Sequence, residues 1–429
     1  MEYPCGLLFD EEFVKEIKKE FYMVDSDPEM GERLFFDNSG GSLRLKKCVE
    51  AKALAETYPD CPERGHVRAV VLKKTVTDGT ELLLNTVFGA KSGTIMTELS
   101  ASQTMFQMVG IIMENVPGKN AVVSSLEHPS AFDAVEYYCK KTGRELRVIP
   151  ANPQTGGIDP SAAAELVDDD TCLLSVMSAS NVSGAINDIA EIVNLARAKK
   201  PNLYIISDAV QHAPHCKLEA EKLGIDGMNF APYKFFGVRG CGFAYVSPRV
   251  AALPHHKLIA KDQGVFELGT PSPGNFAAAI EIVDYVKRIG AHFLPCESDG
   301  DALYAEGMRR IHLQERGLLH RLLEGGDGHI GLRYINGVSV FADHPDLTKR
   351  DLIAAIAIDG LSLSDTVAEY YKRGVVVCDR PRTSMYARRI VDALGIDGAI
   401  RVSPMHCHGR EDIDKFLKIT KEIAEMAKA

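Results

Sequence analysis

The chain has 429 residues and a formal net charge of −10, and 45% of its residues are apolar while 25% are charged. A chain of this length is expected to form two domains rather than one simple core. It contains no dense Lys/Arg run, which argues against nucleic acid as the main partner because phosphate binding needs clustered cations. No apolar stretch approaches the roughly 20 residues of a spanning helix, so we expect no membrane association.

The ten cysteines are scattered along the chain and form no CxxC pair. The N-terminal segment is acidic and mixed, without the basic and apolar regions of a signal peptide. This usage is typical of reduced thiols, and we expect a cytoplasmic protein.

Short β-rich runs alternate with amphipathic helical patterns between residues 120 and 247. This alternation predicts an α/β fold with a large, doubly wound, mostly parallel sheet. The strands read as near-continuous apolar runs, as in a sheet that is covered on both faces. The predicted strands are 121–125, 146–150, 172–178, 203–207, 227–230 and 242–246, with helices over 130–141 and 188–200.

The pattern changes from about residue 285 onward. Charged helices and short strands there favour a smaller α+β domain. We expect a large domain over residues 31–285 and a small one over 286–429, with the polar, helical residues 1–30 packing on the small domain. One long helix over 276–290 is expected to join the two. Within the small domain, the predicted elements are helices over 302–314 and 411–428 and strands over 337–341 and 374–377.

Two polar segments follow neighbouring strands, at the sheet edge where ligands bind in such folds. Asp208 comes directly after one strand, and Lys234 follows the next strand, just before a glycine-rich turn over 237–242. Taken alone, the aspartate is equally consistent with a helix N-cap and the lysine with a solvated surface charge. The GxxGxG spacing of the turn does not match the dinucleotide fingerprint.

Together, these two residues indicate pyridoxal 5'-phosphate (PLP) chemistry. A PLP enzyme needs a lysine that forms a Schiff base with the cofactor and a carboxylate that keeps the pyridine nitrogen protonated. Lysine suits this task because its pKa falls on burial, which leaves a nucleophilic amine. We therefore expect PLP as the cofactor, bound at Lys234.

At this point the sequence resembles the class V aminotransferases of PLP fold type I, which include cysteine desulfurases, selenocysteine lyases and kynureninases. The resemblance runs from about Phe35 to Phe416, and its motifs come in the family's order. It implies an enzyme that acts on a small L-amino acid.

The resemblance implies several cofactor ligands. The small-residue turn Ser100-Ala101-Ser102, at a predicted helix start, is similar to the family's phosphate-binding turn, and a helix N-terminus is an anion site. Tyr233, in place of the commoner histidine before the lysine, is expected to donate to the phosphate. In the segment ELGTP, Thr270 is expected to reach the phosphate of a neighbouring subunit, which implies a homodimer.

Further motifs imply groups around the cofactor ring. In the segment SLEHP, His128 is expected to stack on the ring, although it also suits a helix cap. The turn SASNVSG is similar to the family's "HANNExG", and Asn181 is expected to bind the phenolic oxygen or the substrate carboxylate. The segment DAVQ matches "DAAQ", which assigns Asp208 to the ring nitrogen and Gln211 to the phenolic oxygen.

Two motifs imply the substrate pocket. FDNSGG over 36–41 looks like the family's "LDNAATT" and places Asn38 at the substrate. IRVSP over 400–404 resembles "VRxS", and Arg401 is expected to clamp the substrate α-carboxylate, which a guanidinium fits better than an ammonium does.

The sequence indicates the cofactor more clearly than it indicates the type of reaction. Cysteine desulfurase-like or C–S β-lyase chemistry is favoured, and transamination or epimerisation stays open. A desulfurase needs a mobile cysteine shortly before the arginine. Cys378 is the one candidate there, but it directly follows a predicted strand, so a buried structural thiol is the favoured interpretation. Cys407 has no recognised role.

The sequence gives less support to two other functional classes. A zinc enzyme using His406 and His408, or His212 and His215, lacks an HExxH or CxxC motif, and we expect no metal. A non-catalytic nucleotide-binding α/β protein would have no use for Lys234.

Overall fold

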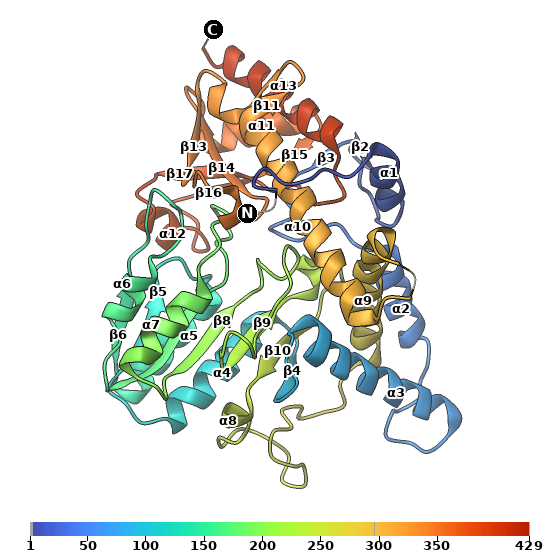
Figure 1. The fold of residues 1–429 in the computed structure, drawn as a ribbon, viewed down its shortest axis with the longest axis vertical. Coiled ribbons are helices and arrows are strands. Elements are labelled where there is room, and N and C mark those ends of the chain that lie inside the picture. Colours follow the sequence, from blue (N-terminus) through green and yellow to red (C-terminus); the bar gives the residue numbers. More distant parts are fainter. Residues whose placement is uncertain (1–2, 296, 429) are drawn as a thin grey trace.

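The structure is a computed structural model that describes residues 3–295 and 297–428. A large sheet with its helices lies on one side, and the C-terminal part of the chain forms a second, smaller layer against it (Figure 1). No helix in these residues is long and apolar enough to cross a membrane.

The large sheet has seven strands in the order β4-β10-β9-β8-β7-β5-β6. The ladder from β9 to β6 is parallel, whereas β10 runs antiparallel to both of its neighbours. This confirms the expected α/β, mostly parallel sheet. Its strands are β4 (Thr94–Glu98), β5 (Asn120–Ser124), β6 (Glu145–Ile149), β7 (Thr171–Met177), β8 (Tyr204–Asp208), β9 (Gly227–Phe230) and β10 (Gly242–Val246).

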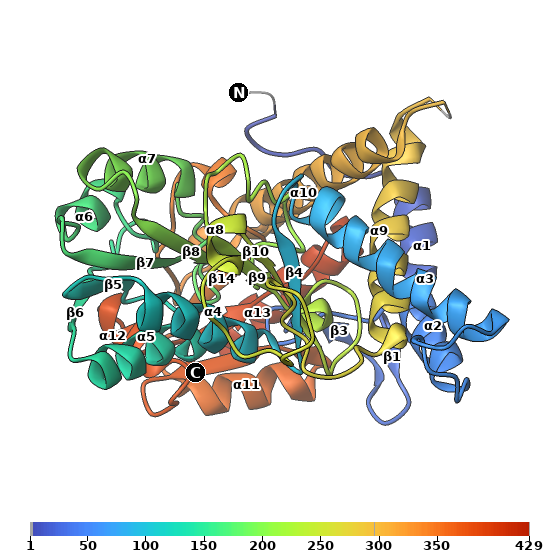
Figure 2. The same cartoon turned by 90° about the horizontal axis from the view of Figure 1, so that it is seen from below.

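Helices cover both faces of this sheet (Figure 2). Alternate residues of one strand therefore enter different cores: Val123 packs with α4 and α5, whereas Val122 packs on the opposite side with Ile192 of α7. Burial on both faces explains why the strands read as continuous apolar runs. The covering helices are α4 (Ala101–Asn115), α5 (Pro129–Thr142), α6 (Pro160–Glu165) and α7 (Ile189–Lys199).

A four-stranded antiparallel sheet, in the order β13-β14-β17-β16, organises the C-terminal part. Its apolar residues pack with Tyr370 of α11 and with Phe416 and Ile423 of α13. The elements are β13 (Val338–Phe341), β14 (Ala354–Ile358), α11 (Leu363–Lys372), β15 (Val375–Val376), β16 (Cys378–Pro381), α12 (Arg388–Ala393), β17 (Gly398–Val402) and α13 (Arg410–Met426).

Two long helices connect these parts, α9 (Pro273–Phe293) and α10 (Gly300–Glu324). The first half of α10 contributes Met308 and Ile311 to the core of the large sheet, and its second half contributes Leu319 and Leu322 to the core of the small sheet. Helices α2 (Lys46–Glu56) and α3 (Val67–Leu82) pack on α9.

The remaining elements are short or peripheral. They are α1 (Glu11–Lys19), β1 (Ser26–Asp27), β2 (Gly31–Glu32), β3 (Leu34–Phe35), η1 (Leu83–Val87), η2 (Pro232–Lys234), α8 (Pro248–Ala251), β11 (Gly325–Gly326), β12 (His329–Ile330), η3 (Leu332–Tyr334) and η4 (Leu347–Lys349).

The predicted strands of the large sheet match β5 to β10 with shifts of about one residue. Two packing contacts cross the boundary that we expected between the two domains. The division into domains itself stays a prediction. Strand β3 pairs with β15, and Phe36 packs in the small core. Phe13 of α1 stacks on His292 of α9, at a ring-centroid distance of 3.9 Å, and joins the large core. In both segments, apolar side chains determine the packing, and a local sequence pattern does not show which part of the protein they will pack on.

Candidate active site

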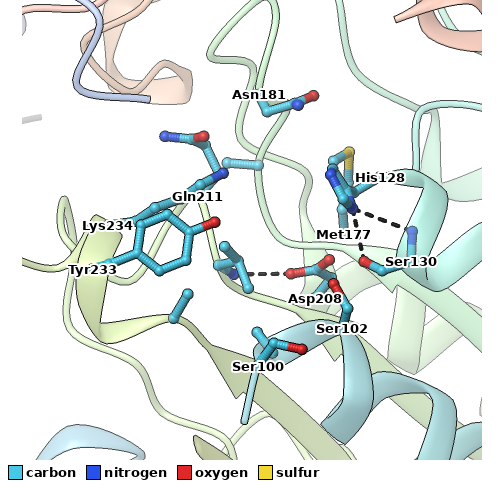
Figure 3. Close-up of a pocket in the computed structure, with 14 residues that line it drawn as sticks. Ser100, Ser102, His128, Ser130, Met177, Asn181, Asp208, Gln211, Tyr233 and Lys234 are labelled. Carbon is cyan, nitrogen blue, oxygen red and sulfur yellow. Dashed lines mark hydrogen bonds between the residues drawn. The ribbon is translucent and has the colours of Figure 1, made fainter. Parts of the chain in front are cut away.

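A pocket lies at the carboxyl edge of the large sheet, where β7, β8 and β9 end (Figure 3). Parallel strands deliver their following residues to the same edge, so segments far apart in sequence meet there. The structure thereby brings together most of the residues that the sequence singled out. The pocket is lined by Ser100, Ala101, Ser102, His128, Ser130, Met177, Ala179, Asn181, Asp208, Val210, Gln211, Ala231, Tyr233 and Lys234.

Lys234 ends the short helical turn η2 directly after β9. Its backbone N–H donates to the carbonyl of Ala231 (2.9 Å), which fixes the turn. Burial and, to a smaller extent, the positive charge of Arg401 together lower the pKa of its amine to about 8, although Asp208 partly opposes both effects. A large fraction of the amine is therefore unprotonated in mildly basic solution, as a nucleophilic lysine requires.

Asp208 is the last residue of β8, and its side chain is 6% exposed. Its Oδ1 accepts a hydrogen bond from the backbone N–H of Val210 (2.9 Å), drawn in Figure 3. Burial raises the pKa of this carboxyl, while the Val210 N–H and the charge of Lys234 act in the opposite direction. A cationic ring nitrogen beside Asp208 would favour the ionised carboxylate.

Two buried amide oxygens in the pocket have no hydrogen-bonding partner, Oδ1 of Asn181 and Oε1 of Gln211. Buried polar atoms are nearly always satisfied in folded proteins, so each such atom in a pocket indicates a ligand. A ligand with hydrogen-bond donors would satisfy these oxygens, and the NH2 groups of the same two side chains could donate to a phenolic oxygen.

The N-terminus of α4 forms one wall of the pocket. Ser100 is its N-cap and accepts from the N–H of Gln103 (3.3 Å), whereas the N–H groups of Ala101 and Ser102 belong to the first turn, which a helix cannot satisfy internally. Asn229 of β9 holds this turn by donating to the carbonyl of Ala101 (2.9 Å). The wall suits an anion such as a phosphate.

The position of Gly242 gives a structural reason for the glycine-rich turn over 237–242, to which the sequence assigned no role. A Cβ at Gly242 would lie 2.2 Å from the backbone nitrogen of Ala101, so only glycine lets β10 pass this close to the start of α4. The glycine therefore serves the packing of the anion-binding helix, not a dinucleotide.

His128 both caps α5 and lines the pocket. Its Nδ1 accepts from the backbone N–H of Ser130 (3.2 Å), which leaves the proton on Nε2. Burial, together with the nearby charges of Lys234 and Arg380, lowers the pKa of this imidazole to about 3. The ring is therefore neutral, as stacking on a protonated pyridine requires. The ring of Tyr386 stacks on it, at 6.0 Å between centroids and 22° between planes.

Tyr233 presents its hydroxyl to the pocket and its ring to two arginines (Figure 3). The guanidinium of Arg239 lies 4.2 Å from the ring centroid and that of Arg44 lies 5.9 Å away. Arg44 also donates to the backbone carbonyl of Tyr233 (2.6 Å). This side of the pocket is cationic.

Arg401 lies on β17 of the small sheet and reaches across to the large one. It donates to the backbone carbonyl of Asn181 (3.2 Å) and forms an ion pair with Asp37 (2.6 Å). A Cβ at Gly40 would lie 2.8 Å from the Asp37 carboxylate, so the glycine leaves room for this pair. An incoming substrate carboxylate would exchange with Asp37 at the guanidinium.

Asn38 is placed differently from the expectation that it binds substrate. Its Nδ2 donates to the carbonyls of Phe35 (2.9 Å) and Ser403 (3.0 Å), and its Oδ1 accepts from the N–H of Leu43 (3.0 Å). These backbone bonds hold its side chain outside the set that lines the pocket. Asn38 thus fixes the loop, and its neighbour Asp37 is the residue that faces Arg401.

Thr270 does not line this pocket either, and its hydroxyl donates to Glu63 (2.7 Å). The expectation that it serves a neighbouring subunit stays a prediction.

Cys378 begins strand β16 and pairs with Arg401 across the ladder, so it lies inside a strand and not just after one. Burial raises the pKa of its thiol. A thiol held in a paired strand lacks the mobility that a sulfur carrier needs.

The proposed zinc ligands have other partners. His212 pairs with Asp351 (2.9 Å) and His215 with Glu315 (2.7 Å). Within residues 3–295 and 297–428, no group of three or more His, Cys, Asp or Glu side chains is arranged to hold a metal ion.

Sequence reasoning missed Asp37, Asn229 and Arg380. Asp37 stood inside a quoted motif but was not assigned a role, while Asn229 lies within an apolar strand. Arg380 shows its relation to the pocket only through β16, a strand that the sequence did not predict.

The pocket fits PLP. The unpaired amide side chains of Asn181 and Gln211 can donate to its phenolic oxygen through their NH2 groups, the α4 N-terminus suits its phosphate, and Asp208 suits its ring nitrogen. The amine of Lys234 lies in the same pocket and can bind the aldehyde of PLP.

The lowered pKa of Lys234 is testable in cofactor-free protein with an amine-acylating reagent. We expect labelling of Lys234 to rise as the pH passes about 8, because the unprotonated amine is the reactive form. Mass spectrometry of the Lys234 peptide measures it, with Lys15 as an exposed reference. A midpoint above pH 10 would contradict the buried environment described here.

The Aminotransferase class-V family matches residues 34–416. A cysteine desulfurase of Cronobacter sakazakii is 31% identical over 189 residues, which cover 40% of this chain and 46% of that protein. A probable cysteine desulfurase of Synechocystis is 22% identical over 423 residues, 94% of this chain and 93% of that protein. The chain thus aligns with about half the length of the first relative and nearly all of the second.

Solved structures show the same fold. The apo structure of a cysteine desulfurase from Thermococcus onnurineus superposes with a TM-score of 0.81 at 21% identity, over 98% of this chain and all of that one. The Escherichia coli cysteine desulfurase CsdA gives a TM-score of 0.78 at 17% identity, over 98% of this chain and all of that one. With the family match over nearly the whole chain, this protein belongs to the class V aminotransferase family, whose members are PLP-dependent enzymes.

Proposed function

We propose that the protein binds PLP at Lys234 and cleaves the C–S bond of a small, cysteine-like L-amino acid. The observation that carries this proposal is that Asp208 at the end of β8, Lys234 in the turn after β9 and Arg401 on β17 of the small sheet come close enough for the charges of Asp208 and Arg401 to act on the Lys234 amine. The curated relatives described above are named as cysteine desulfurases, which supports sulfur chemistry on the same scaffold.

Each pocket residue takes a role from its geometry. Arg401 binds the substrate α-carboxylate in place of Asp37, because a guanidinium holds a carboxylate through two parallel bonds. The neutral ring of His128 covers one face of the cofactor site. The amine of Lys234, whose pKa is about 8, moves the proton at the substrate α-carbon as general base.

The bound cofactor would supply the electron sink that stabilises negative charge at the α-carbon. Asp208 supports this by holding the ring nitrogen in its protonated form, since its buried carboxylate is stabilised by a partner of opposite charge. Asn181 and Gln211 would hold the phenolic oxygen, and Ser100, Ala101, Ser102 and Tyr233 the phosphate.

Between the two sulfur chemistries, β-elimination is better supported than sulfur transfer to a protein thiol. The segment between β16 and α12 contains no cysteine, and Cys378 is fixed in the strand opposite Arg401. A C–S β-lyase needs no such thiol, because it releases sulfide and leaves pyruvate and ammonia.

A homodimer is also proposed. Leu99 is 73% exposed and Leu268 is 56% exposed, and both line one groove with Thr270. Exposed apolar side chains in one groove are typical of an interface. A second copy packed there would bring Thr270 toward the neighbouring pocket. The cysteine usage favours a cytoplasmic location.

The assignment of Lys234 is tested by replacing it with alanine. The wild-type protein, purified with PLP, is expected to be yellow and to keep its cofactor after borohydride treatment and denaturation. The Lys234→Ala variant is expected to lose this covalent attachment completely, because no amine remains to bind the aldehyde. Mass spectrometry of the reduced protein measures it, with Lys52→Ala as control. Attachment that persists in Lys234→Ala would rule the assignment out.

The role of Cys378 is tested with L-cysteine as substrate. Cys378→Ala is expected to release sulfide within twofold of the wild-type rate and to form pyruvate, not alanine, since no thiol carries the sulfur. Sulfide and keto-acid assays measure both products, with Cys61→Ala as control. A loss above tenfold that is confined to Cys378→Ala would make this residue a sulfur carrier.

The groove between β4 and the 265–275 segment is tested by sedimentation. The double variant Leu99→Asp and Leu268→Asp is expected to sediment as a monomer, because two buried charges disfavour an apolar interface. Tyr371→Asp, on exposed α11, is expected to stay dimeric like the wild type. A monomeric wild-type protein at micromolar concentration would contradict the proposed dimer.

A further inference from the structure

Arg380 is a cation that the roles above leave unassigned. It lies on β16, two residues after Cys378, so both side chains leave the same face of the strand. Because Cys378 pairs directly with Arg401, this face is also the one that carries Arg401. Arg380 therefore lies on the side of the small sheet that faces the pocket.

The charge of Arg380 acts on groups inside the pocket. It lowers the pKa of Lys234 and that of His128, although burial is the larger cause in both cases. These two residues belong to the large sheet and its helices, so the guanidinium reaches across the gap between the two sheets. Arg380 and the cofactor-binding groups thus share one electrostatic environment.

Arg380 lacks a counter-ion. Its Nη2 donates to the backbone carbonyl of Tyr386 (2.7 Å), and its buried Nε has no partner. In the described parts of the chain, no carboxylate lies within ion-pair distance of it, whereas Arg401 has Asp37. A largely buried guanidinium beside a second one is unfavourable unless an anion joins it.

Arg380 is also connected to His128. Its Nη2 donates to the backbone carbonyl of Tyr386, whose ring stacks on that of His128, a residue that lines the pocket. Its charge acts on both His128 and Lys234, so the guanidinium lies close to pocket residues and not only to Arg401.

We propose that Arg380 forms a subsite for a negatively charged side-chain group of the amino-acid substrate, while Arg401 holds the α-carboxylate. This rests on the proposed function, in which Arg401 anchors the substrate. Arg380 lies opposite Ala399, so it is a diagonal neighbour of Arg401, and such pairs are about 7–8 Å apart. Long side chains at this separation can hold two anionic groups of one small molecule. The side-chain group is either a carboxylate, which a guanidinium can hold through two parallel bonds, or a thiolate, which its positive charge stabilises.

The carboxylate case is tested by binding. L-Aspartate and L-asparagine have the same shape and differ in side-chain charge, and their Kd values follow from the change in cofactor absorbance on titration of the holoenzyme. The wild type is expected to bind aspartate about tenfold more tightly than asparagine. In Arg380→Gln this preference falls below twofold while the Kd for asparagine is unchanged.

The thiolate case is tested by turnover of L-cysteine. If Arg380 stabilises the departing sulfur, Arg380→Gln lowers kcat for sulfide release by about tenfold and leaves KM within twofold. Arg380→Lys keeps the charge and is expected to retain part of either effect. It also provides a folded comparison if the glutamine variant loses its cofactor.

Arg382→Gln is the matched control, because Arg382 lies two residues further on, is exposed, and pairs with Asp392. Either loss, confined to Arg380 variants, supports the subsite. Unchanged aspartate preference together with unchanged sulfide release in Arg380→Gln overturns it, as does an equal loss in Arg382→Gln.

Failure of the proposed function gives a different result. If Arg401→Gln weakens aspartate and asparagine binding equally, the α-carboxylate anchor stands whatever Arg380 does. If no amino acid perturbs the cofactor absorbance of the wild type, the proposed function and the subsite fall together.

Discussion

The burial of a lysine and an aspartate at one edge of a parallel sheet is the constraint around which this pocket is arranged. Burial pushes both groups toward their neutral forms, lowering the pKa of Lys234 and raising that of Asp208. Each charged form therefore depends on a partner of opposite sign. The doubly wound sheet satisfies this dependence because β8 and β9 deliver the two residues side by side at their carboxyl ends. Asn181, Gln211 and the first turn of α4 complete a site for an anionic, ring-shaped cofactor.

The second sheet supplies two positive charges close to the pocket. Arg401 and Arg380 come from neighbouring strands β17 and β16, and of these two only Arg401 has a carboxylate partner, Asp37. This concentration of positive charge occurs in a protein whose net charge is −10. Helix α10 contributes side chains to the cores of both sheets and so connects them. Lys234 and Arg401 belong to different sheets, so a movement of one sheet relative to the other would change the distance between them.

Much of the large sheet was predictable because its strands are buried on both faces and read as uninterrupted apolar runs. The small sheet was less so, because β14, β16 and β17 were not predicted. The sequence also did not show the packing contacts of β3 and Phe36 with the small sheet, or of Phe13 in α1 with α9. The local sequence pattern of each segment shows that one face is apolar, but it does not show which other surface packs on that face.

The sequence by itself indicated the cofactor class through Lys234 and Asp208 after neighbouring strands, and it indicated the family through motifs that resemble the family's in the same order. Tertiary structure alone decided which residues accompany Arg401. Register between β16 and β17 sets Arg380 and Cys378 beside Arg401, and backbone hydrogen bonds turn Asn38 away while Asp37 faces the guanidinium. Pairing across a sheet and competition for a buried charge depend on residues distant in sequence, so no local pattern carries them.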